Sequence, residues 1–183
     1  MHITKTNLNN CLIIQPDIFK DERGYFFESF NQQRFEEATG ISPHFVQDNE
    51  SQSQYGTIRG LHMQTGKWSQ AKLIRVIKGK VKDVVIDMRK DSPTFKQKFE
   101  IELSEDNKTQ LYVPKGFLHG FSVLSETAIF SYKCDNYYHK VAETGVNPLD
   151  KTLNINWGVS AEEAIISGKD KEARGFENIL KRW

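Results

Sequence analysis

Two segments, each with a histidine beside a glycine, carry the residues best suited to chemistry. One is residues 59–64 (RGLHMQ), which follows the polar run 47–51 (QDNES), and the other is residues 114–121 (PKGFLHGF). Histidine exchanges protons near neutral pH, so His62 and His119 are candidates for acid–base catalysis. A single strand histidine is more often structural than catalytic, but two in this setting make the two interpretations equally good.

The segment around His62 predicts a strand that presents polar groups to a barrel interior. If residues alternate from Arg59 onward, Gly60, His62 and Gln64 face one side, and Arg59 and Leu61 face the other. A polar interior costs free energy unless it serves a function. We therefore expect His62 to face a site.

A third candidate is Tyr132, in the motif Ser131-Tyr132-Lys133 of a half-apolar segment. A phenol keeps its proton at neutral pH and can donate it in a reaction. A core position with a satisfied hydroxyl explains this tyrosine equally well.

The elements that must position these residues are short segments of period-two hydrophobicity, which predict strands. They are residues 12–15, 25–30, 72–78, 81–88, 99–103, 111–113, 121–124 and 128–132. Turn residues separate them, and we expect tight hairpins at Gly79-Lys80 and at 104–107, a wider turn at 91–93 and a corner at 114–116. This pattern is typical of an all-β sandwich or barrel of the jelly-roll type, and the length of 183 residues suits a single domain over 1–183.

Two short peripheral helices are also expected. Residues 32–39 have Asn31 as N-cap, Phe30 and Phe35 spaced as a hydrophobic staple, and Gly40 as the C-terminal stop. Residues 160–163 have capping-box spacing, which predicts a second helix before the polar stretch 167–170.

Composition restricts the partners. The chain has 25 Lys plus Arg against 24 Asp plus Glu, a formal net charge of +1, which gives no global attraction for nucleic acid or an anionic membrane. The start has no secretory pattern and no apolar run has the length of a membrane span, so we expect a cytoplasmic protein. Cys11 and Cys134 lie far apart in the sequence, which favours two reduced thiols.

A metal-binding cupin is an alternative, because a small barrel with two histidine-bearing strands is the usual frame of such sites. A metal site needs several imidazole or carboxylate ligands that converge on one ion. Gln64 stands where a second histidine ligand is common, and no glutamate follows closely. We therefore expect no metal.

In order and spacing, five motifs together resemble the dTDP-4-dehydrorhamnose 3,5-epimerase family: residues 21–28 (DERGYFFE), 47–49 (QDN), 59–64 (RGLHMQ), 114–121 (PKGFLHGF) and 132–133 (YK). The resemblance covers almost the whole chain. It implies a jelly-roll cupin fold (a double-stranded β-helix), a homodimer and no cofactor. It also implies conversion of dTDP-4-dehydro-6-deoxy-D-glucose to dTDP-4-dehydro-L-rhamnose in dTDP-L-rhamnose biosynthesis.

The resemblance further implies roles for individual residues. His62 matches the family's base, Tyr132 matches its acid, and Asp170 supplies the carboxylate that holds His62 in one tautomer, with Asp83 as the alternative partner. We expect Lys72 to stabilise the enolate oxygen. Positions that match substrate contacts, or that line the same pocket, are Arg23, Glu28, Gln47, Asn49, Arg59, His119, Glu143 and Lys169.

Two competing functions stay open at this point. A related enzyme that inverts carbon 3 alone would use much of the same site, although Tyr132 favours the double reaction. A sugar-nucleotide binder without activity would be expected to lack the base or the acid, and both His62 and Tyr132 are present.

Overall fold

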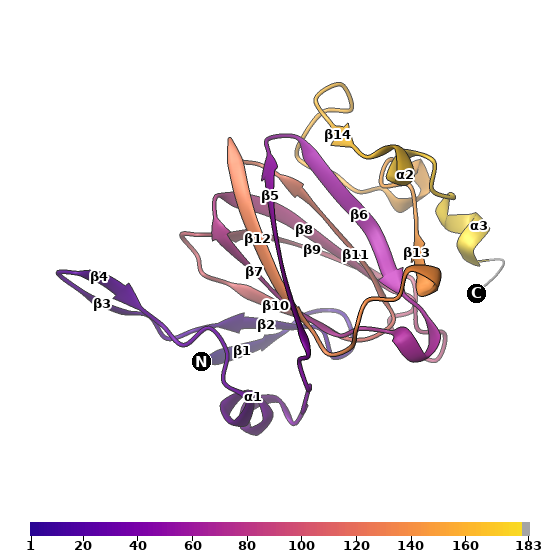
Figure 1. The fold of residues 1–183 in the computed structure, drawn as a ribbon. Coiled ribbons are helices and arrows are strands. Elements are labelled where there is room, and N and C mark those ends of the chain that lie inside the picture. Colours follow the sequence, from indigo (N-terminus) through magenta and orange to yellow (C-terminus); the bar gives the residue numbers. More distant parts are fainter. Residues whose placement is uncertain (181–183) are drawn as a thin grey trace.

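The computed structural model describes residues 1–180, which form two facing β-sheets (Figure 1). The first sheet has the strand order β1 (His2–Lys5), β2 (Leu12–Gln15), β10 (Gln110–Val113), β7 (Lys72–Lys78), β12 (Thr127–Cys134), β5 (Gln47–Gln54). The second has the order β13 (Glu143–Gly145), β6 (Thr57–Gln64), β11 (Phe117–Val123), β8 (Lys80–Asp87), β9 (Lys98–Ser104), and β14 (Ile165–Ile166) lies parallel to β6. The predicted all-β fold is therefore confirmed.

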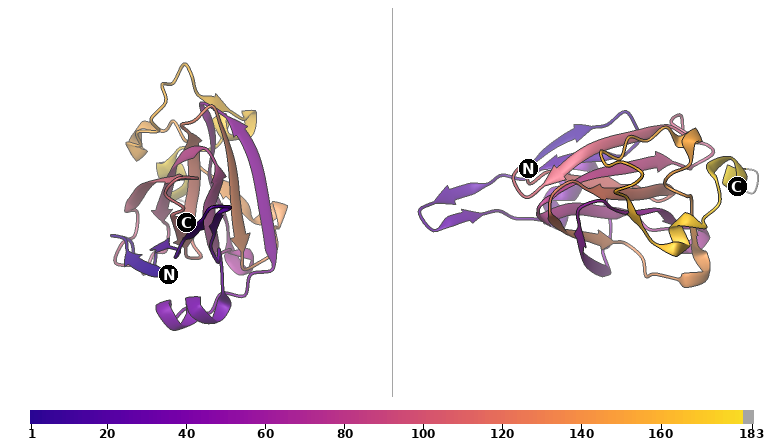
Figure 2. Two further views of the ribbon diagram at one scale, coloured as in Figure 1. Left: turned by 90° about the vertical axis from the view of Figure 1, so that its left-hand side faces the viewer. Right: turned by 90° about the horizontal axis from the view of Figure 1, so that it is seen from above.

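The remaining elements are peripheral. Strands β3 (Phe19–Asp21) and β4 (Gly24–Phe26) form a hairpin, here called the arm, that projects from the body (Figures 1 and 2). The helices are α1 (Gln32–Thr39), α2 (Gly168–Lys171) and α3 (Phe176–Leu180), and the 3₁₀ turns are η1 (Gly66–Trp68), η2 (Lys140–Ala142) and η3 (Lys151–Leu153). Among residues 1–180, no helix is both long and apolar enough to cross a membrane.

From β5 to β12 the chain passes back and forth between the sheets, as in a double-stranded β-helix. The hairpins predicted at Gly79-Lys80 and at 104–107 are wrong, because both turns carry the chain from one sheet to the other. The corner at 114–116 and the wider turn at 91–93, which joins the paired strands β8 and β9, are confirmed. Gly79 is required at its crossing, since its φ is 76° and an added Cβ would lie 2.1 Å from the Thr127 carbonyl oxygen.

Apolar side chains from both sheets meet in the main core. Their burial supplies the chief driving force for folding. The core includes Ile74, Val76, Val85, Leu111, Phe117, Phe121 and Phe130.

A second core lies on the outer face of the second sheet, under residues 146–180, here called the C-terminal strap. Ile58 and Leu61 of β6 pack there against Trp157 and Phe176 of the strap. The Trp157 indole also donates a hydrogen bond to the Pro148 carbonyl oxygen at 2.8 Å. These contacts fix the strap against β6, so Ser167, Lys169 and Asp170, which belong to the strap, are held beside this strand.

Helix α1 has the bounds and caps that the sequence predicts. The Asn31 side chain accepts from the Arg34 amide, and Gly40 has a φ of 70° with its N–H donating to the Glu36 carbonyl oxygen. Phe35 is buried against the outer face of the first sheet and lies 5.9 Å from the Phe30 ring centroid. The helix therefore covers this sheet from outside.

Two sequence predictions of local structure are wrong. Residues 160–163 form the reciprocal Ser160 and Glu163 hydrogen bonds of a capping box, yet only a turn follows, and the helix starts later, after Ser167. The predicted strand 25–30 is limited to β4, which ends at Phe26 in the exposed arm. Strand β5 was missed because its sequence, QDNESQSQ, has no apolar alternation.

Candidate active site

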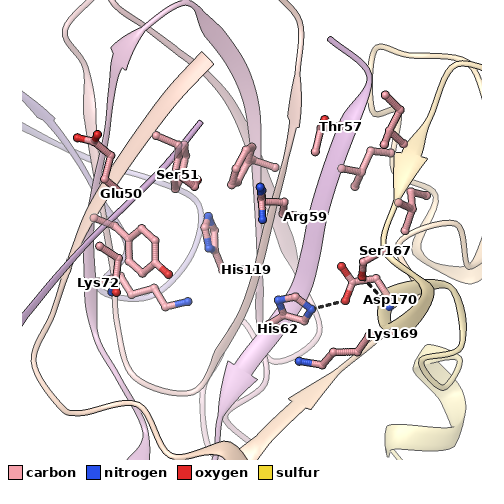
Figure 3. A pocket seen from close by; sticks show the side chains of 17 residues that line it. Glu50, Ser51, Thr57, Arg59, His62, Lys72, His119, Ser167, Lys169 and Asp170 are labelled. Carbon is pink, nitrogen blue, oxygen red and sulfur yellow. Dashed lines mark hydrogen bonds and ion pairs between the residues drawn. The ribbon is translucent and has the colours of Figure 1, made fainter. Parts of the chain in front are cut away.

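A cavity of about 590 Å³ lies between the two sheets, beyond the main core (Figure 3). Its walls come from β5, β6, β7, β11 and β12 and from the strap, while Phe121 and Phe130 line it where it meets the core. Eight of the twelve predicted site residues line it: Asn49, Arg59, His62, Lys72, His119, Tyr132, Lys169 and Asp170.

A bulge in β6 brings Arg59 and His62 to the same cavity. The prediction that they face opposite sides is wrong, because two residues of β6, Gly60 and Leu61, stand opposite the single residue Gly120 of β11. The strands approach closely here, and a Cβ on Gly60 would lie 2.6 Å from the Gly120 Cα. Glycine is therefore needed at the bulge.

His62 forms a dyad with Asp170, which comes from the strap. The His62 Nε2 and Asp170 Oδ1 atoms are 2.5 Å apart. A dashed line marks this contact in Figure 3. The Ser167 hydroxyl accepts a hydrogen bond from the Asp170 backbone N–H. Burial would raise the pKa of Asp170, but the hydrogen bond and charge of His62 outweigh it and lower this pKa below the ordinary value. The carboxylate is thus ionised beside the imidazole, which leaves Nδ1 of His62 for a ligand.

His119 forms a second dyad with Asp83. It lies directly opposite His62 in the β6–β11 pair, and its Nε2 is 2.8 Å from Asp83 Oδ2 on β8. Burial lowers the pKa of His119, and the nearby Asp83 only partly opposes this. Asp83, the alternative partner considered for His62, therefore pairs with the neighbouring histidine.

Lys72 and Tyr132 face these histidines from the first sheet. The Lys72 ammonium lies 5.5 Å from the centroid of the Tyr132 ring. Burial lowers the pKa of Lys72, because the ammonium has lost water, and burial raises the pKa of Tyr132 to about 12. The phenol is therefore firmly protonated at neutral pH, and the lysine is the group whose charge changes more readily.

Cationic and polar side chains extend from the cavity towards its rim. Lys169 forms a close ion pair with Glu143, which also accepts a hydrogen bond from the Tyr138 hydroxyl at 3.1 Å. Gln47 lies outside the cavity lining but donates to Asn49 Oδ1 at 3.0 Å and accepts from the Tyr138 amide. The predicted contacts Gln47 and Glu143 are thus joined to residues that line the cavity.

The structure does not bring Arg23 and Glu28 to this cavity. Arg23 is at the tip of the arm, where it pairs with Asp21 and its side chain is 85% exposed. Glu28, just beyond the arm, pairs with Arg34 of α1. Arg23 therefore lies in the arm and Glu28 lies next to it.

Sequence reasoning missed several residues that line the cavity. They are polar or aliphatic residues, some within the runs 47–51 and 167–170, that residue type alone does not mark as site residues: Glu50, Ser51, Thr57, Ile58, Ile165, Ile166 and Ser167. Their common signal is position, because they belong to β5, β6 and the strap, whose pairing the sequence does not reveal. Among residues 1–180, no three His, Cys, Asp or Glu side chains are grouped to hold a metal ion.

The arrangement suits proton transfer at carbon. An imidazole held by a carboxylate stands on one sheet, and a protonated phenol and a lysine stand on the sheet that faces it. Such groups can remove a proton beside a carbonyl and return one from the other side. Fold and site together fit the class of cupin-fold proteins whose cavity is suited to acid–base chemistry.

Comparisons with known proteins identify the family. A family model described as dTDP-4-dehydrorhamnose 3,5-epimerase matches residues 5–178. An enzyme of that name from Shigella flexneri is 48% identical over 176 residues, 96% of each chain. The crystal structure of one from Elizabethkingia anophelis has a TM-score of 0.93 at 52% identity, covering 97% of each chain.

A third comparison includes a bound sugar nucleotide. The crystal structure of a dTDP-6-deoxy-D-glucose-3,5-epimerase from Legionella pneumophila, in complex with dTDP-4-keto-L-rhamnose, has a TM-score of 0.92 at 47% identity. The match covers 97% of this chain and 94% of that chain. The chain therefore belongs to the dTDP-4-dehydrorhamnose 3,5-epimerase family, whose members are isomerases of nucleotide-linked sugars.

Proposed function

We propose that the cavity converts dTDP-4-dehydro-6-deoxy-D-glucose to dTDP-4-dehydro-L-rhamnose by proton transfer at carbons 3 and 5. The observation that carries this proposal is the position of His62 and Tyr132 on facing sheets around one cavity. Both carbons flank the keto group, so loss of either proton gives an enolate. Return of a proton to the opposite face inverts the carbon without a redox step, so the reaction balances with no cofactor.

His62 is the proposed base and Tyr132 the proposed acid. The Asp170 carboxylate holds the Nε2–H of His62, so the lone pair on Nδ1 is free to take a proton from the sugar. Tyr132 delivers a proton from the facing wall as the enolate collapses. Lys72, beside Tyr132, stabilises the negative oxygen of the enolate.

The nucleotide end of the substrate requires positive charge. Arg59 and Lys169 line the cavity, and a diphosphate suits an arginine fork together with lysine charge. Asn49, Gln47 and Glu143 supply polar contacts at the same rim. The exposed Tyr138 ring, with its hydroxyl held by Glu143, can pack on thymine.

A homodimer accounts for the position of the arm. Phe19, Tyr25 and Phe26 are exposed by 56 to 68% on this projecting hairpin, and Arg23 lies at its tip. Exposed aromatic groups of this kind mark an interface. We place the arm of one protomer against the partner's cavity, where Arg23 and Glu28 complete the nucleotide site.

The two free thiols, Cys11 and Cys134, are buried, and reduced thiols suit a protein of the cytoplasm.

The experiment that tests the function is incubation with dTDP-4-dehydro-6-deoxyglucose in deuterium oxide, with a rhamnose-forming reductase and NADPH to trap the product. Deuterium at carbons 3 and 5 of dTDP-L-rhamnose is expected. Label at carbon 3 alone would indicate a single epimerase, and label at neither carbon would contradict the proposal. Full activity after chelation, with no stoichiometric metal in elemental analysis, is expected as well.

Complementation between two inactive variants tests the dimer. In a mixture of Arg23→Ala and His62→Ala proteins, a heterodimer has one cavity with an intact His62 and an intact Arg23 from the partner. Activity should therefore return after subunit exchange. A mixture that stays as inactive as its components would show that the arm serves its own protomer, and a monomer in light scattering would exclude the arrangement altogether.

A further inference from the structure

Asp83 is a buried carboxylate with an incomplete set of partners. It lies on β8 with 0% of its side chain exposed, and Oδ2 accepts from His119 Nε2 at 2.8 Å. Among residues 1–180, Oδ1 has no hydrogen-bond partner. Burying a carboxylate that has only one hydrogen bond lowers the stability of the fold. A contribution to stability therefore does not explain why an aspartate occupies position 83.

Asp87, four residues along the same strand, shows what a structural carboxylate looks like in this protein. It is equally buried, but its oxygens accept from the Arg89 guanidinium and from the Ser92 and Thr94 hydroxyls. Those bonds close the turn between β8 and β9. The contrast assigns the single strong bond of Asp83 to the orientation of His119.

The bond from Asp83 determines what His119 can offer to a ligand. A carboxylate accepts only, so the proton of the neutral ring resides on Nε2 and the lone pair on Nδ1. His119 lines the cavity (Figure 3). Its Nε2 is bonded to Asp83, so Nδ1 is the ring nitrogen left for a ligand. The Nδ1 lone pair can accept a hydrogen bond from a hydroxyl of the ligand, but it would repel the negative oxygen of an enolate.

We propose that Asp83 is a positioning residue that keeps His119 in the tautomer whose Nδ1 accepts a hydrogen bond from a ring hydroxyl of the sugar. This inference rests on the proposed function, because it takes the sugar to lie in this cavity. The proposal gives Lys72 and His119, which both line the cavity, different roles. Lys72 donates to the keto oxygen, and His119 holds a hydroxyl and remains neutral, in agreement with its burial.

The tautomer can be measured directly without substrate. Long-range ¹H–¹⁵N correlation spectra of the ¹⁵N-histidine protein at neutral pH report which ring nitrogen carries the proton, and His119→Ala identifies the signals of residue 119. We expect a protonated Nε2 and an unprotonated Nδ1. A proton on Nδ1, or on both nitrogens, would overturn the proposal even for a fully active enzyme.

The kinetic test uses the same substitution at two buried positions of β8. Asp83→Asn keeps the shape but replaces a charged acceptor by an amide, which can also turn its NH₂ towards Nε2 and reverse the tautomer. We expect a loss of kcat/KM on the order of 10- to 100-fold with a melting temperature near that of the wild type. Asp87→Asn, the matched control, should lower the melting temperature and leave kcat/KM unchanged.

A double variant shows whether Asp83 acts through His119. In the His119→Ala background, Asp83→Asn should cost less than about twofold, because the ring that it positions is gone. An equal loss in both backgrounds would overturn the proposal and assign the effect to the charge of Lys72, which Asp83 also favours. Failure of the proposed function would instead appear as no deuterium exchange in the wild-type protein.

Discussion

The two histidine dyads of the cavity have the same chemistry but different construction. His62 and His119 are paired neighbours on adjacent strands of one sheet, and the Nε2 of each is hydrogen-bonded to a carboxylate. Asp170 reaches His62 from the strap, 108 residues along the chain, whereas Asp83 reaches His119 from the next strand of the same sheet. The His62 side chain is 29% exposed and the His119 side chain 8%.

This difference in exposure agrees with the proposed roles, in which His62 transfers protons and His119 makes a fixed contact. The open dyad, His62 with Asp170, suits proton transfer, because its carboxylate is ionised and its imidazole is partly exposed to solvent. In the closed dyad, His119 with Asp83, a charged imidazole is unfavourable, since burial lowers the pKa of His119. We therefore expect the two dyads to respond differently to the same substitutions.

The largest effect is expected when each histidine is removed in turn. His62→Ala should abolish deuterium exchange at both carbons, a loss on the order of 10⁴, because it removes the base. His119→Ala should keep exchange and lose about 10- to 100-fold in kcat/KM through one lost hydrogen bond. Deuterium exchange is measured by NMR for both variants. Complete loss of exchange in both would mean that the two dyads do not differ in role.

Tyr132→Phe should separate proton removal from inversion. The base on the second sheet is intact, so exchange of deuterium into the substrate continues, while trapped product falls on the order of 10²-fold without the acid on the facing sheet. The ratio of exchanged substrate to trapped product measures this. Complete loss of exchange would mean that the tyrosine takes part in the removal of the proton.

Asp170→Asn should reduce the rate of exchange by about 100-fold at both carbons. The amide no longer stabilises the charged ring that forms when His62 takes a proton, as in other histidine–carboxylate pairs. Single-turnover exchange in deuterium oxide gives this rate apart from product release. A wild-type rate would assign Asp170 to the anchoring of the strap alone.

The sequence predicts most of the strands that line the cavity, but not β5 or the position of the strap. Alternating apolar residues identified the inner strands, and local capping residues identified α1, because both signals depend on neighbours in the chain. The strand β5 has no such signal, since its pairing with β12 determines its position. Turn residues alone do not distinguish a hairpin from a crossing between sheets, which is why the hairpin prediction at Gly79 is wrong.

The same limit applies to the site. His62 and Tyr132 stand out by residue type and motif, but the alternation that separated Arg59 from His62 could not include a bulge opposite Gly120. The choice between Asp83 and Asp170 as partner of His62 also depends on tertiary structure. It is decided by the strap that packs on the outer face of β6, which no local pattern reveals.

The pH profile should distinguish the two groups on the first sheet. Burial lowers the pKa of Lys72, while burial raises the pKa of Tyr132 to about 12, so Lys72 loses its proton first as the pH rises. We therefore expect the alkaline limb of kcat/KM to follow Lys72. Lys72→Arg should move this limb to higher pH by about one unit or more, because the guanidinium stays charged. A limb that moves in Tyr132→Phe would contradict the assignment.

The smallest expected effect concerns stability in acid and returns to the open dyad. The pKa of Asp170 is lower in the folded state than its ordinary value, through the bond and charge of His62 after the opposing effect of burial. The unfolded chain therefore binds a proton more readily, so this contribution is present above the ordinary aspartate pKa of about 3.9 and is lost as the pH falls through the lower folded value. Asp170→Asn should reduce the free energy of unfolding on the order of 1 kcal/mol at neutral pH, and urea titrations at falling pH should show this difference shrinking. A difference that stays constant down to acid pH would mean that Asp170 stabilises the strap through bonds that do not depend on its charge.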